Sequence, residues 1–380
     1  MAAMVPGRVL NEGRYKVTRE LNRGATAVVY EAQDLQDPGG SPVALKVLNA
    51  TGGQMSVPLK IVKREVQYAC NMRHNNIVRL LDVFAEGKQL ILVWELISGP
   101  DLLDLLNEHG GRMPEDLMAF YFYQLVKGVV FMHDNGFCHR DLKPENCMVE
   151  KETQLLKIID FGLSKHIDSV NTLGVGTPDY MCPEMLGIGP SMTGAGPKYD
   201  AKAVDVWAMG VLMYLLVTGV YPFEDPAHPN SVSHTLQNVR AGRMRPFPDH
   251  VTQECGEIIK HMLQREPHRR INLKQIMQHP WLKTHAMIHA KKIGRPELGS
   301  DDSGAVRIGG GGGGSPASEE AVGADAKFEK IAKRVTSDVR DEGSSPRGQP
   351  GCFGSVAGRK STMSLTSRLR RFFGGGSLAN

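Results

Sequence analysis

The first part of the chain has the apolar and polar pattern of β-strands. Between residues 13 and 50, Gly and Pro separate three runs rich in β-branched and apolar residues, namely YKVTREL, AVVYEAQD and PVALKVL. Such runs are typical of strands. Residues 58–73 have apolar residues at helical spacing with a Pro near the start, which predicts a helix. Two more strand-like runs follow, IVRLLDVF and QLILVWEL, so the pattern predicts a strand-rich unit with one main helix.

After the tetrapeptide SGPD the pattern becomes helical. The stretches LLDLLNEHG and EDLMAFYFYQLVKGVVFMHDNG have helical periodicity, and the second ends in Asn-Gly, which is a common stop signal. Residues 201–282 continue as helices separated by Pro-rich loops. A strand-rich segment followed by a helix-rich one predicts an α+β fold of two lobes that join near residues 96–100.

The basic residues in excess lie mainly in the last hundred residues. The formal net charge is +4 over 380 residues, and residues 283–380 hold 16 Lys+Arg against 10 Asp+Glu. The rest of the chain is slightly acidic, so we do not expect the main domain to bind nucleic acid. The apolar run WAMGVLMYLLVTGVYPF is about 17 residues long, which favours a buried core helix over a membrane span.

The cysteines and the N-terminus indicate the compartment. None of the six cysteines belongs to a CxxC pair or shows His/Cys ligand spacing, which predicts neither a disulfide framework nor a zinc site. The start MAAMVPGRVL lacks a charged region followed by an apolar one, so we expect no secretory signal. A reducing location follows, cytoplasmic and/or nuclear.

The motifs that carry chemistry lie in CHRDLKPENCMVE and, shortly after it, LLKIIDFGLSK. Together with the upstream VALK strand, they occur in the order and at the intervals of the eukaryotic protein kinases, which the chain resembles over residues 13–282. The resemblance implies a bilobal protein kinase fold with a small lobe at 13–97 and a helical lobe at 98–282. An N-terminal extension (1–12) and a tail (283–380) flank it.

The resemblance implies Mg-ATP as the phosphate donor and gives roles to the motif residues. Lys46 would hold the α- and β-phosphates, with Glu65 orienting it as an ion pair. Asp141 would accept the proton of the substrate hydroxyl. Lys143, which matches the serine/threonine-specific form of the loop, would contact the γ-phosphate. Two more residues would hold Mg²⁺, which prefers oxygen ligands: Asn146 and Asp160.

The loop that would cover the phosphates, LNRGATAVVY, departs from the family pattern. Gly24 is kept, but Asn22 and Ala27 stand where the family has glycines. Every charged group of the site is present, which favours an active enzyme; the alternatives are a catalytically inactive scaffold and a kinase inhibited by its own tail. Trp94 matches the gatekeeper position behind the adenine. The residues that match ATP-contacting positions are Leu21, Gly24, Val29, Ala44, Lys46, Glu95, Ile97 and Met148.

Regulatory and structural roles also follow from the resemblance. Arg140 would bind a phosphate on the activation segment, for which the candidate acceptors are Thr172, Ser169 and Ser164, with Thr172 the first choice. Thr177 would help to shape the substrate site. Three residues would stabilise the helical lobe, two as a buried ion pair and one as an anchor of the catalytic loop: Glu184 with Arg270, and Asp205.

Four further stretches narrow the resemblance, namely CHRDLK, VGTP, YPFEDPAHPN and HPWL. They resemble the calcium/calmodulin-dependent kinase-like group, and within it the plant SNF1-related stress kinases of the second subfamily. This implies stress or nutrient signalling, protein substrates, an upstream activating kinase and a phosphatase. Asp101 and Glu145 match acidic positions that meet an arginine three residues before the target, which predicts an Arg-x-x-Ser/Thr preference. The oligomeric state stays open.

The tail combines a flexible linker with one helical stretch. RIGGGGGGSPASEE has linker composition. FEKIAKRVTSDV has apolar residues on one helix face, which predicts a short amphipathic helix near 326–340. Three roles stay open for this helix: it supports the small lobe, it blocks the active site, or it does neither.

Overall fold

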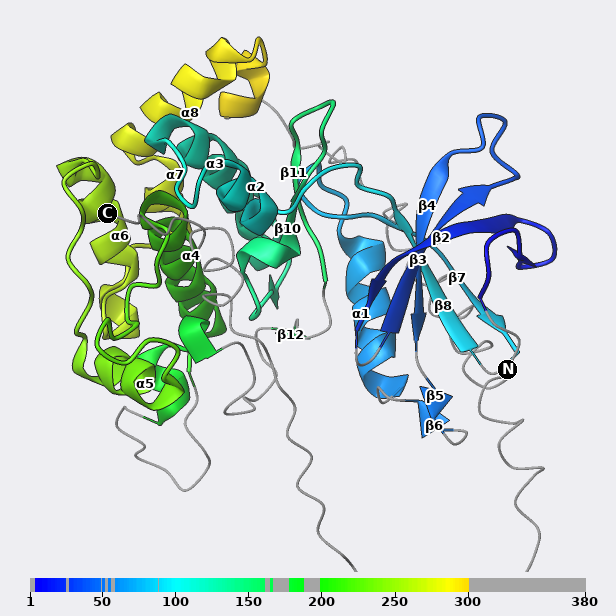
Figure 1. The fold of residues 1–380 in the computed structure, drawn as a ribbon, viewed down its shortest axis with the longest axis horizontal. Coiled ribbons are helices and arrows are strands. Elements are labelled where there is room, and N and C mark those ends of the chain that lie inside the picture. The colour runs from blue at the N-terminus through cyan, green and yellow to red at the C-terminus, as the bar shows by residue number, and fades with distance from the viewer. Residues whose placement is uncertain are drawn as a thin grey trace, which may run out of the picture.

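The computed structural model has two lobes, one built on a β-sheet and one built from helices (Figure 1). This arrangement confirms the predicted α+β, bilobal fold. Thr172, Thr177 and the predicted helix near 326–340 lie outside the residues that the structure describes. The described residues are 4–24, 27–48, 50–51, 54–55, 59–87, 89–160, 165–166, 178–187 and 199–300.

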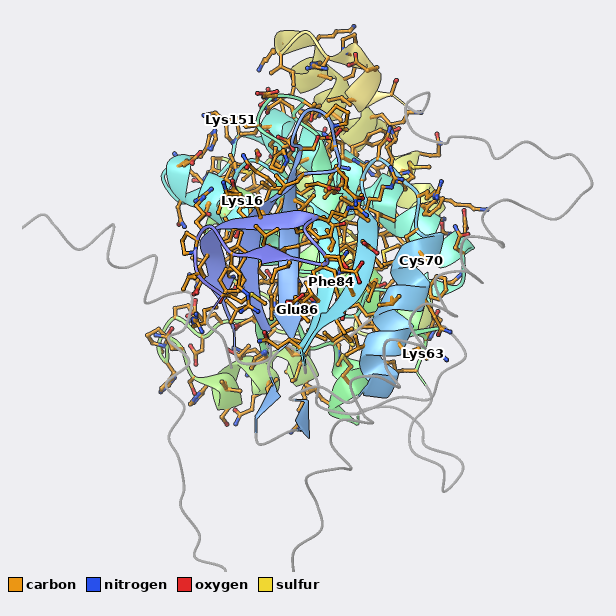
Figure 2. The ribbon with its side chains drawn as sticks, turned by 90° about the vertical axis from the view of Figure 1, so that its right-hand side faces the viewer. Lys16, Lys63, Cys70, Phe84, Glu86 and Lys151 are labelled. Atoms are coloured by element: carbon orange, nitrogen blue, oxygen red, sulfur yellow. The ribbon has the colours of Figure 1, made fainter. Side chains whose placement is uncertain are left out.

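The small lobe contains a six-stranded antiparallel sheet with the strand order β1-β2-β3-β4-β8-β7. A two-stranded hairpin and helix α1 complete the lobe, and α1 lies on the side that faces the helical lobe (Figure 1). Figure 2 shows α1, with Lys63 and Cys70, beside β7, with Phe84 and Glu86. The elements are β1 (Val9–Leu10), β2 (Tyr15–Arg23), β3 (Ala27–Asp34), β4 (Pro42–Leu48), β5 (Ala50–Thr51), β6 (Gln54–Met55), α1 (Leu59–Asn71), β7 (Leu80–Glu86) and β8 (Gln89–Glu95).

Alternation along β4 separates a packing face from a functional face. Val43, Leu45 and Val47 are buried in a cluster on one side of the sheet. Because successive side chains of a strand point to opposite faces, Ala44 and Lys46 lie on the other side. The apolar residues of α1 and the even-numbered apolar residues of β8 belong to a different cluster, which continues into the helical lobe. The period of two therefore directs Lys46 away from the packing face.

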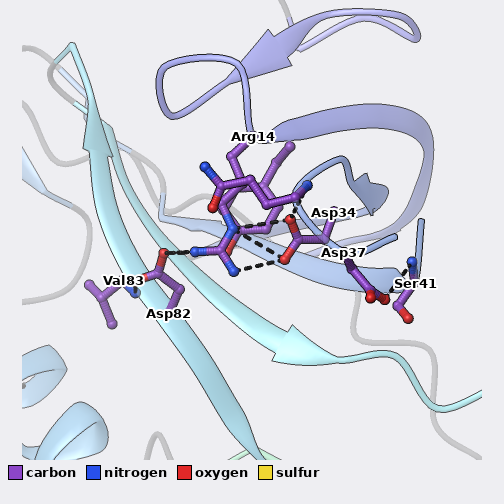
Figure 3. A network of polar contacts seen from close by, with 8 residues as sticks. Arg14, Asp34, Asp37, Ser41, Asp82 and Val83 are labelled. Carbon is purple, nitrogen blue, oxygen red and sulfur yellow. Dashed lines mark hydrogen bonds and ion pairs between the residues drawn. The ribbon is translucent and has the colours of Figure 1, made fainter. Parts of the chain in front are cut away.

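A partly buried arginine connects three strands in the outer part of the sheet (Figure 3). The Arg14 guanidinium donates to Asp34, with Nε–Oδ1 and Nη2–Oδ2 distances of 3.0 and 2.8 Å. Its Nη1 lies 3.5 Å from Asp82 Oδ2 on β7. The hydrogen bonds from Arg14 hold the pKa of the Asp34 carboxyl below its ordinary value. One side chain thus connects the start of β2, the end of β3 and β7.

The helical lobe is built around α4, which is almost entirely buried. By length and composition α4 is the one helix of the described residues that qualifies as a membrane span, but 89% of its 18-residue window is buried inside the lobe, as in a core helix. It ends at Gly219, where φ is 77° and a Cβ would lie 2.2 Å from the Gly111 carbonyl oxygen, so only glycine fits. The helices are α2 (Leu102–Glu108), α3 (Glu115–Asp134), α4 (Ala201–Thr218), α5 (Val232–Ala241), α6 (Gln253–Met262), α7 (Leu273–Met277) and α8 (Pro280–Lys292).

Short strands and 3₁₀ turns complete the structure between the longer helices. Two strand pairs, β10 with β11 and β9 with β12, lie next to α3 and α2. The short strands are β9 (Phe137–Cys138), β10 (Cys147–Val149), β11 (Leu156–Ile158) and β12 (Lys165–His166). The 3₁₀ turns are η1 (Pro144–Asn146), η2 (Pro178–Tyr180), η3 (Pro183–Leu186), η4 (Pro267–Arg269) and η5 (Pro296–Gly299).

Two boundaries differ from those that the sequence pattern predicts. The run IVRLLDVF begins at residue 77, but β7 begins at Leu80, because Ile77 forms a bridge with Ile158 and Val78 donates to the Ile158 carbonyl. The helical lobe also continues beyond residue 282. Helix α8 extends to Lys292, and the Ser300 carbonyl accepts a hydrogen bond of 2.8 Å from Lys127 on α3. In both cases a partner distant in sequence sets the boundary.

Glu184 and Arg270 form a bidentate ion pair inside the helical lobe. The Nη1–Oε1 and Nη2–Oε2 distances are 2.6 and 2.7 Å, and the two side chains are 1% and 10% exposed for Arg270 and Glu184. Arg270 also donates to the Ala203 carbonyl and lies 4.9 Å from the centre of the Trp207 ring. The pair joins η3 to the start of α4 and to the turn that precedes α7.

We expect Arg270→Leu to destabilise the protein strongly, because it leaves the Glu184 carboxylate buried without its counter-ion. Removing one partner of a buried pair costs about 3–5 kcal/mol of unfolding free energy. Urea denaturation of the full chain measures this loss. Arg19→Gln is the matched control, since Arg19 is 68% exposed in its ion pair with Glu31 and should contribute under about 1 kcal/mol. Equal losses in the two variants would contradict the role assigned to the buried pair.

Candidate active site

An ion-paired lysine lies where the two lobes meet. The Lys46 Nζ on β4 lies 2.6 Å from Glu65 Oε1 on α1 and 3.3 Å from Asp160 Oδ1, which follows β11. Glu65 is only 5% exposed, whereas the Asp160 side chain is 51% exposed. The amphipathic helix α1 buries Val62 and Val66 together with Glu65, so packing holds the carboxylate toward the sheet. Three elements distant in sequence thus meet at one ammonium group.

The charge of Lys46 is maintained against the effect of burial. Burial by itself would lower the pKa of this ammonium group. The negative charges of Glu65 and Asp160 and their hydrogen bonds outweigh that effect, and the pKa of Lys46 lies above its ordinary value. The site therefore presents a permanent cation next to an exposed carboxylate.

The second part of the site is the loop between β9 and β10. Lys143 Nζ lies 2.9 Å from Asp141 Oδ2. Asn146 is buried in η1 and donates through Nδ2 to the Asp141 carbonyl at 2.8 Å and to Asp141 Oδ2 at 3.2 Å. The loop therefore brings a carboxylate, an ammonium group and an amide together within six residues.

Asp205 of α4 holds this loop from beneath. The carboxylate is fully buried and accepts backbone N–H bonds from His139 at 2.9 Å and from Arg140 at 2.7 Å. A third bond, 2.8 Å long, comes from His133 Nε2. Burial alone would raise the pKa of Asp205, but the hydrogen bond from His133 and the nearby histidine and backbone donors lower it below its ordinary value. Asp205 therefore stays ionised within the core.

Sequence reasoning missed His133 and Tyr199. His133 belongs to the last turn of α3, and the only signal for it was a histidine inside an otherwise apolar helix. Tyr199 lies just before α4, and its hydroxyl accepts a 2.5 Å hydrogen bond from Arg140 Nη2. Arg140 has a φ of 68° and its Nε has no partner among the described residues. The guanidinium thus faces a tyrosine, while the candidate phosphate acceptor Thr172 lies outside the described residues, as does Thr177.

The residues that match ATP-contacting positions border the same region. Ala44 pairs with the buried Trp94 across β4 and β8, and Val29 pairs with Lys46 across β3 and β4. Met148 of β10 forms a bridge with Asp101. The remaining matches lie at or just after the end of β8 (Glu95 and Ile97) and at the end of β2 or just after it (Leu21 and Gly24).

The backbone of this region leaves groups free for a ligand. The Glu95 side chain is held by Lys157 Nζ and by the N–H of Arg79, both at 2.8 Å. No described residue accepts a hydrogen bond from the Ile97 N–H. Among the described residues, a Cβ on Gly24 would meet only the Ala27 carbonyl oxygen, at the ordinary distance of 3.5 Å. The described residues therefore leave this position open to close approach by a ligand.

The oxygen donors fit a magnesium ion. Asn146 uses its amide nitrogen on Asp141, so the amide oxygen remains for a metal. The Asp160 carboxylate is 51% exposed and lies next to Lys46, so it is a candidate oxygen ligand beside the phosphate-binding cation. Mg²⁺ takes one or two such protein oxygen atoms and completes its shell with water and phosphate.

The comparisons with known proteins agree with this geometry. The Protein kinase domain family model matches residues 15–282. CBL-interacting protein kinase 11 of Oryza sativa subsp. japonica is 32% identical over 83% of this chain and 61% of its own length. The SNF-related serine/threonine-protein kinase of Homo sapiens is 36% identical over 71% of this chain and 34% of its own length.

A third relative is covered more completely. Serine/threonine-protein kinase SAPK9 of Oryza sativa subsp. japonica is 34% identical over 72% of this chain and 73% of its own length. The match covers only 61% of CBL-interacting protein kinase 11, 51% of CBL-interacting protein kinase 19 of the same plant and 34% of the human SNF-related kinase. Much of the length of those proteins therefore has no counterpart in the match. The family match and the relatives together show that the chain belongs to the protein kinase family and is similar, within it, to the SNF1-related serine/threonine kinases.

Proposed function

We propose that this protein is a serine/threonine protein kinase that transfers the γ-phosphate of Mg-ATP to protein hydroxyl groups. The observation that carries the proposal is the double contact of Lys46 with Glu65 and Asp160. This contact sets the phosphate-binding cation and a metal-binding carboxylate side by side. The family match and the names of the relatives support the same activity.

Each charged group has a task in phosphoryl transfer, which depends mainly on positioning and charge stabilisation. Lys46 neutralises phosphate oxygens, and Glu65 keeps its ammonium group in place. Asp160 and the Asn146 amide oxygen would hold Mg²⁺, which would supply charge neutralisation on the phosphates. The substrate hydroxyl gives its proton to Asp141 and is oriented by it.

Lys143 would lie beside the substrate hydroxyl that accepts the phosphate. It is bonded to the Asp141 carboxylate and so stands where charge develops on the transferred group. The scaffold alternative is weaker, because none of the groups that phosphoryl transfer needs is missing. The substitutions Asn22 and Ala27 in the phosphate-covering loop leave Gly24 in place.

Regulation and location extend the proposal. We propose phosphorylation of the activation segment, with Thr172 as the candidate, by an upstream kinase and its reversal by a phosphatase. Such a phosphate would replace Tyr199 as the partner of Arg140.

The similarity to SNF-related kinases supports a role in stress or nutrient signalling, and the CBL-interacting relatives suggest a regulatory protein partner. A cytoplasmic and/or nuclear location fits the described cysteines, none of which forms a disulfide.

A preference for basic substrates rests on Glu145. Its Oε2 is buried and has no hydrogen-bond partner among the described residues. An unpaired carboxylate oxygen is costly to bury, and a substrate guanidinium that reaches this half-buried side chain would satisfy it. Asp101 differs, because its Oδ1 already accepts the N–H groups of Leu103 and Asp104 as the N-cap of α2. We therefore propose that Glu145 is the main acidic determinant and Asp101 the lesser one.

The activity is tested by phosphate transfer from labelled Mg-ATP to a peptide with Arg three residues before Ser. We expect Asp160→Asn to lower the rate by roughly 10³-fold, because the metal loses an anionic ligand. Glu65→Gln should lower kcat/KM by about 10- to 100-fold, the value of one charge-assisted hydrogen bond. Asp249→Asn, on an exposed loop, is the control. Equal rates in all four proteins would overturn the assignment.

Substrate preference is tested with paired peptides that carry Arg or Ala at that upstream position. We expect Glu145→Gln to reduce the Arg preference about 10-fold while turnover of the Ala peptide stays unchanged. Asp101→Asn keeps the helix cap, since Asn caps as well as Asp, and should have a smaller effect. A preference that survives both substitutions would place the determinant elsewhere without affecting the proposed activity.

Trp94 should exclude ATP-competitive inhibitors that reach behind the adenine. It is only 7% exposed and pairs with Ala44, so its indole fills that space. We expect Trp94→Gly to lower the inhibitory concentration of a bulky adenine analogue by at least about 10-fold, or about 1.4 kcal/mol. Trp94→Phe is the matched control and should remain resistant. Because the cavity destabilises the core, folding of each variant is checked by thermal melting; equal inhibition of folded variants would refute the gatekeeper role.

A further inference from the structure

Arg140 is fixed to the start of helix α4 through both its main chain and its side chain. Its backbone N–H donates to Asp205 Oδ1 at 2.7 Å, and Asp205 lies within α4. Its Nη2 donates to the Tyr199 hydroxyl at 2.5 Å, and Tyr199 comes directly before Asp200, the N-cap of that helix. Because Asp141 follows Arg140 in the chain, these contacts also restrain the loop that carries the proposed catalytic carboxylate.

The side-chain contact is a charge-assisted one. Burial raises the pKa of the Tyr199 hydroxyl above its ordinary value, so the hydroxyl stays neutral while the guanidinium stays charged. A hydrogen bond with an ionised donor is roughly twice as strong as one between neutral groups. The Arg140 Cζ also lies 5.8 Å from the centre of the Tyr199 ring, within the range of a cation–π contact. Hydroxyl and ring thus stabilise the guanidinium in the same position.

The contact acts on a strained piece of backbone. Arg140 has a φ of 68°, a left-handed conformation that costs free energy in a residue with a side chain. Loss of the bond to Tyr199 would leave less to oppose relaxation of this backbone. Relaxation would displace Asp141, whose carboxylate lies 2.9 Å from Lys143 Nζ and 3.2 Å from Asn146 Nδ2. The hydroxyl of one tyrosine is therefore linked to the alignment of these three groups.

We propose that Tyr199 is a positioning residue for phosphate transfer. Through Arg140 it holds the loop of Asp141 in its catalytic conformation when the activation segment carries no phosphate. This inference rests on the proposed kinase function and adds to it an activity that does not require phosphorylation. Tyr199 acts through the arginine and not on the nucleotide, so its loss should lower the rate of transfer and leave the affinity for ATP unchanged.

Tyr214 offers a matched control on the same helix. It is fully buried, and its hydroxyl donates to the carbonyl oxygens of Arg245 and Pro246, at 3.3 and 3.2 Å. Tyr214→Phe therefore removes one hydroxyl from α4 without altering a contact of Arg140. An effect that comes only from a less stable helical lobe should appear in this variant as well.

The test compares the full-length parent, Tyr199→Phe and Tyr214→Phe after phosphatase treatment, with removal of phosphate confirmed by mass spectrometry. Initial rates are measured with Mg-ATP and the peptide that has Arg three residues before Ser. We expect Tyr199→Phe to lower kcat about 10-fold, the effect of one charge-assisted hydrogen bond, at unchanged KM for ATP. Tyr214→Phe should keep the kcat of the parent. Thermal melting establishes that each variant is folded.

A double-mutant cycle tests whether Tyr199 acts through Arg140. In the background of Arg140→Met the hydroxyl has no guanidinium to hold, so Tyr199→Phe should lower kcat by less than about 2-fold. Hydrogen exchange gives a readout that does not depend on activity. Exchange of the segment 139–141 should be faster in Tyr199→Phe than in the parent, and unchanged in Tyr214→Phe. Equal losses of kcat in both backgrounds, or unchanged exchange in Tyr199→Phe, would overturn the inference.

The parent itself separates this inference from the proposed function. Transfer by the untreated parent but not by the phosphatase-treated parent would overturn the role of Tyr199 and leave the kinase function intact. No transfer by either form would overturn the kinase function and the inference with it. A kcat of Tyr199→Phe equal to or above that of the parent would mean that the hydroxyl does not support the loop.

Discussion

The contact between Lys46, Glu65 and Asp160 is the interaction on which the proposed site depends. It is electrostatically demanding, because burial opposes the charge on the lysine. Removal of either acid would leave the ammonium group less compensated, so each of the three elements holds the other two. The small lobe supplies the cation and one anion, and the segment after β11 supplies the other anion. The relation between the two lobes is therefore coupled directly to the state of the site.

Asp205 stabilises the loop that carries Asp141 by accepting two of its backbone N–H groups. A fully buried carboxylate is tolerated only when its oxygens are satisfied, and here two backbone N–H groups and His133 do so. The arrangement also explains an unusual backbone conformation. Arg140 and Asp160 have φ values of 68° and 62°, which non-glycine residues adopt at a cost of about 1–3 kcal/mol each. Hydrogen bonds to Asp205 hold the first of these, and the contact with Lys46 accompanies the second.

The sequence predicted the residues whose type the chemistry requires. It did not predict features that depend on a contact with residues distant in the sequence. The period of two in β4 and the motif spacing were sufficient to predict the fold and to select Lys46, Glu65 and Asp160. The start of β7 could not be predicted from its own residues, because Ile77 pairs with Ile158 of the other lobe. The ordered residues after 282 were missed for a similar reason, since α8 and η5 are held by contacts with α3. Tyr199 carried no local signal, as its partner is an arginine nearly sixty residues earlier.

The pair of Arg140 and Tyr199 would connect these anchors to the proposed regulation by phosphorylation. Burial raises the pKa of the Tyr199 hydroxyl above its ordinary value, so the arginine is bonded to a neutral group. A phosphate with a charge near −2 would bring an opposite charge to the guanidinium, which the neutral tyrosine hydroxyl does not. The tyrosine therefore keeps the guanidinium oriented but does not neutralise it. The Arg140 Nε, which has no hydrogen-bond partner among the described residues, retains capacity for a second bond. Because the backbone of Arg140 is fixed to Asp205, an exchange of partners at its side chain would act on the same loop that carries Asp141.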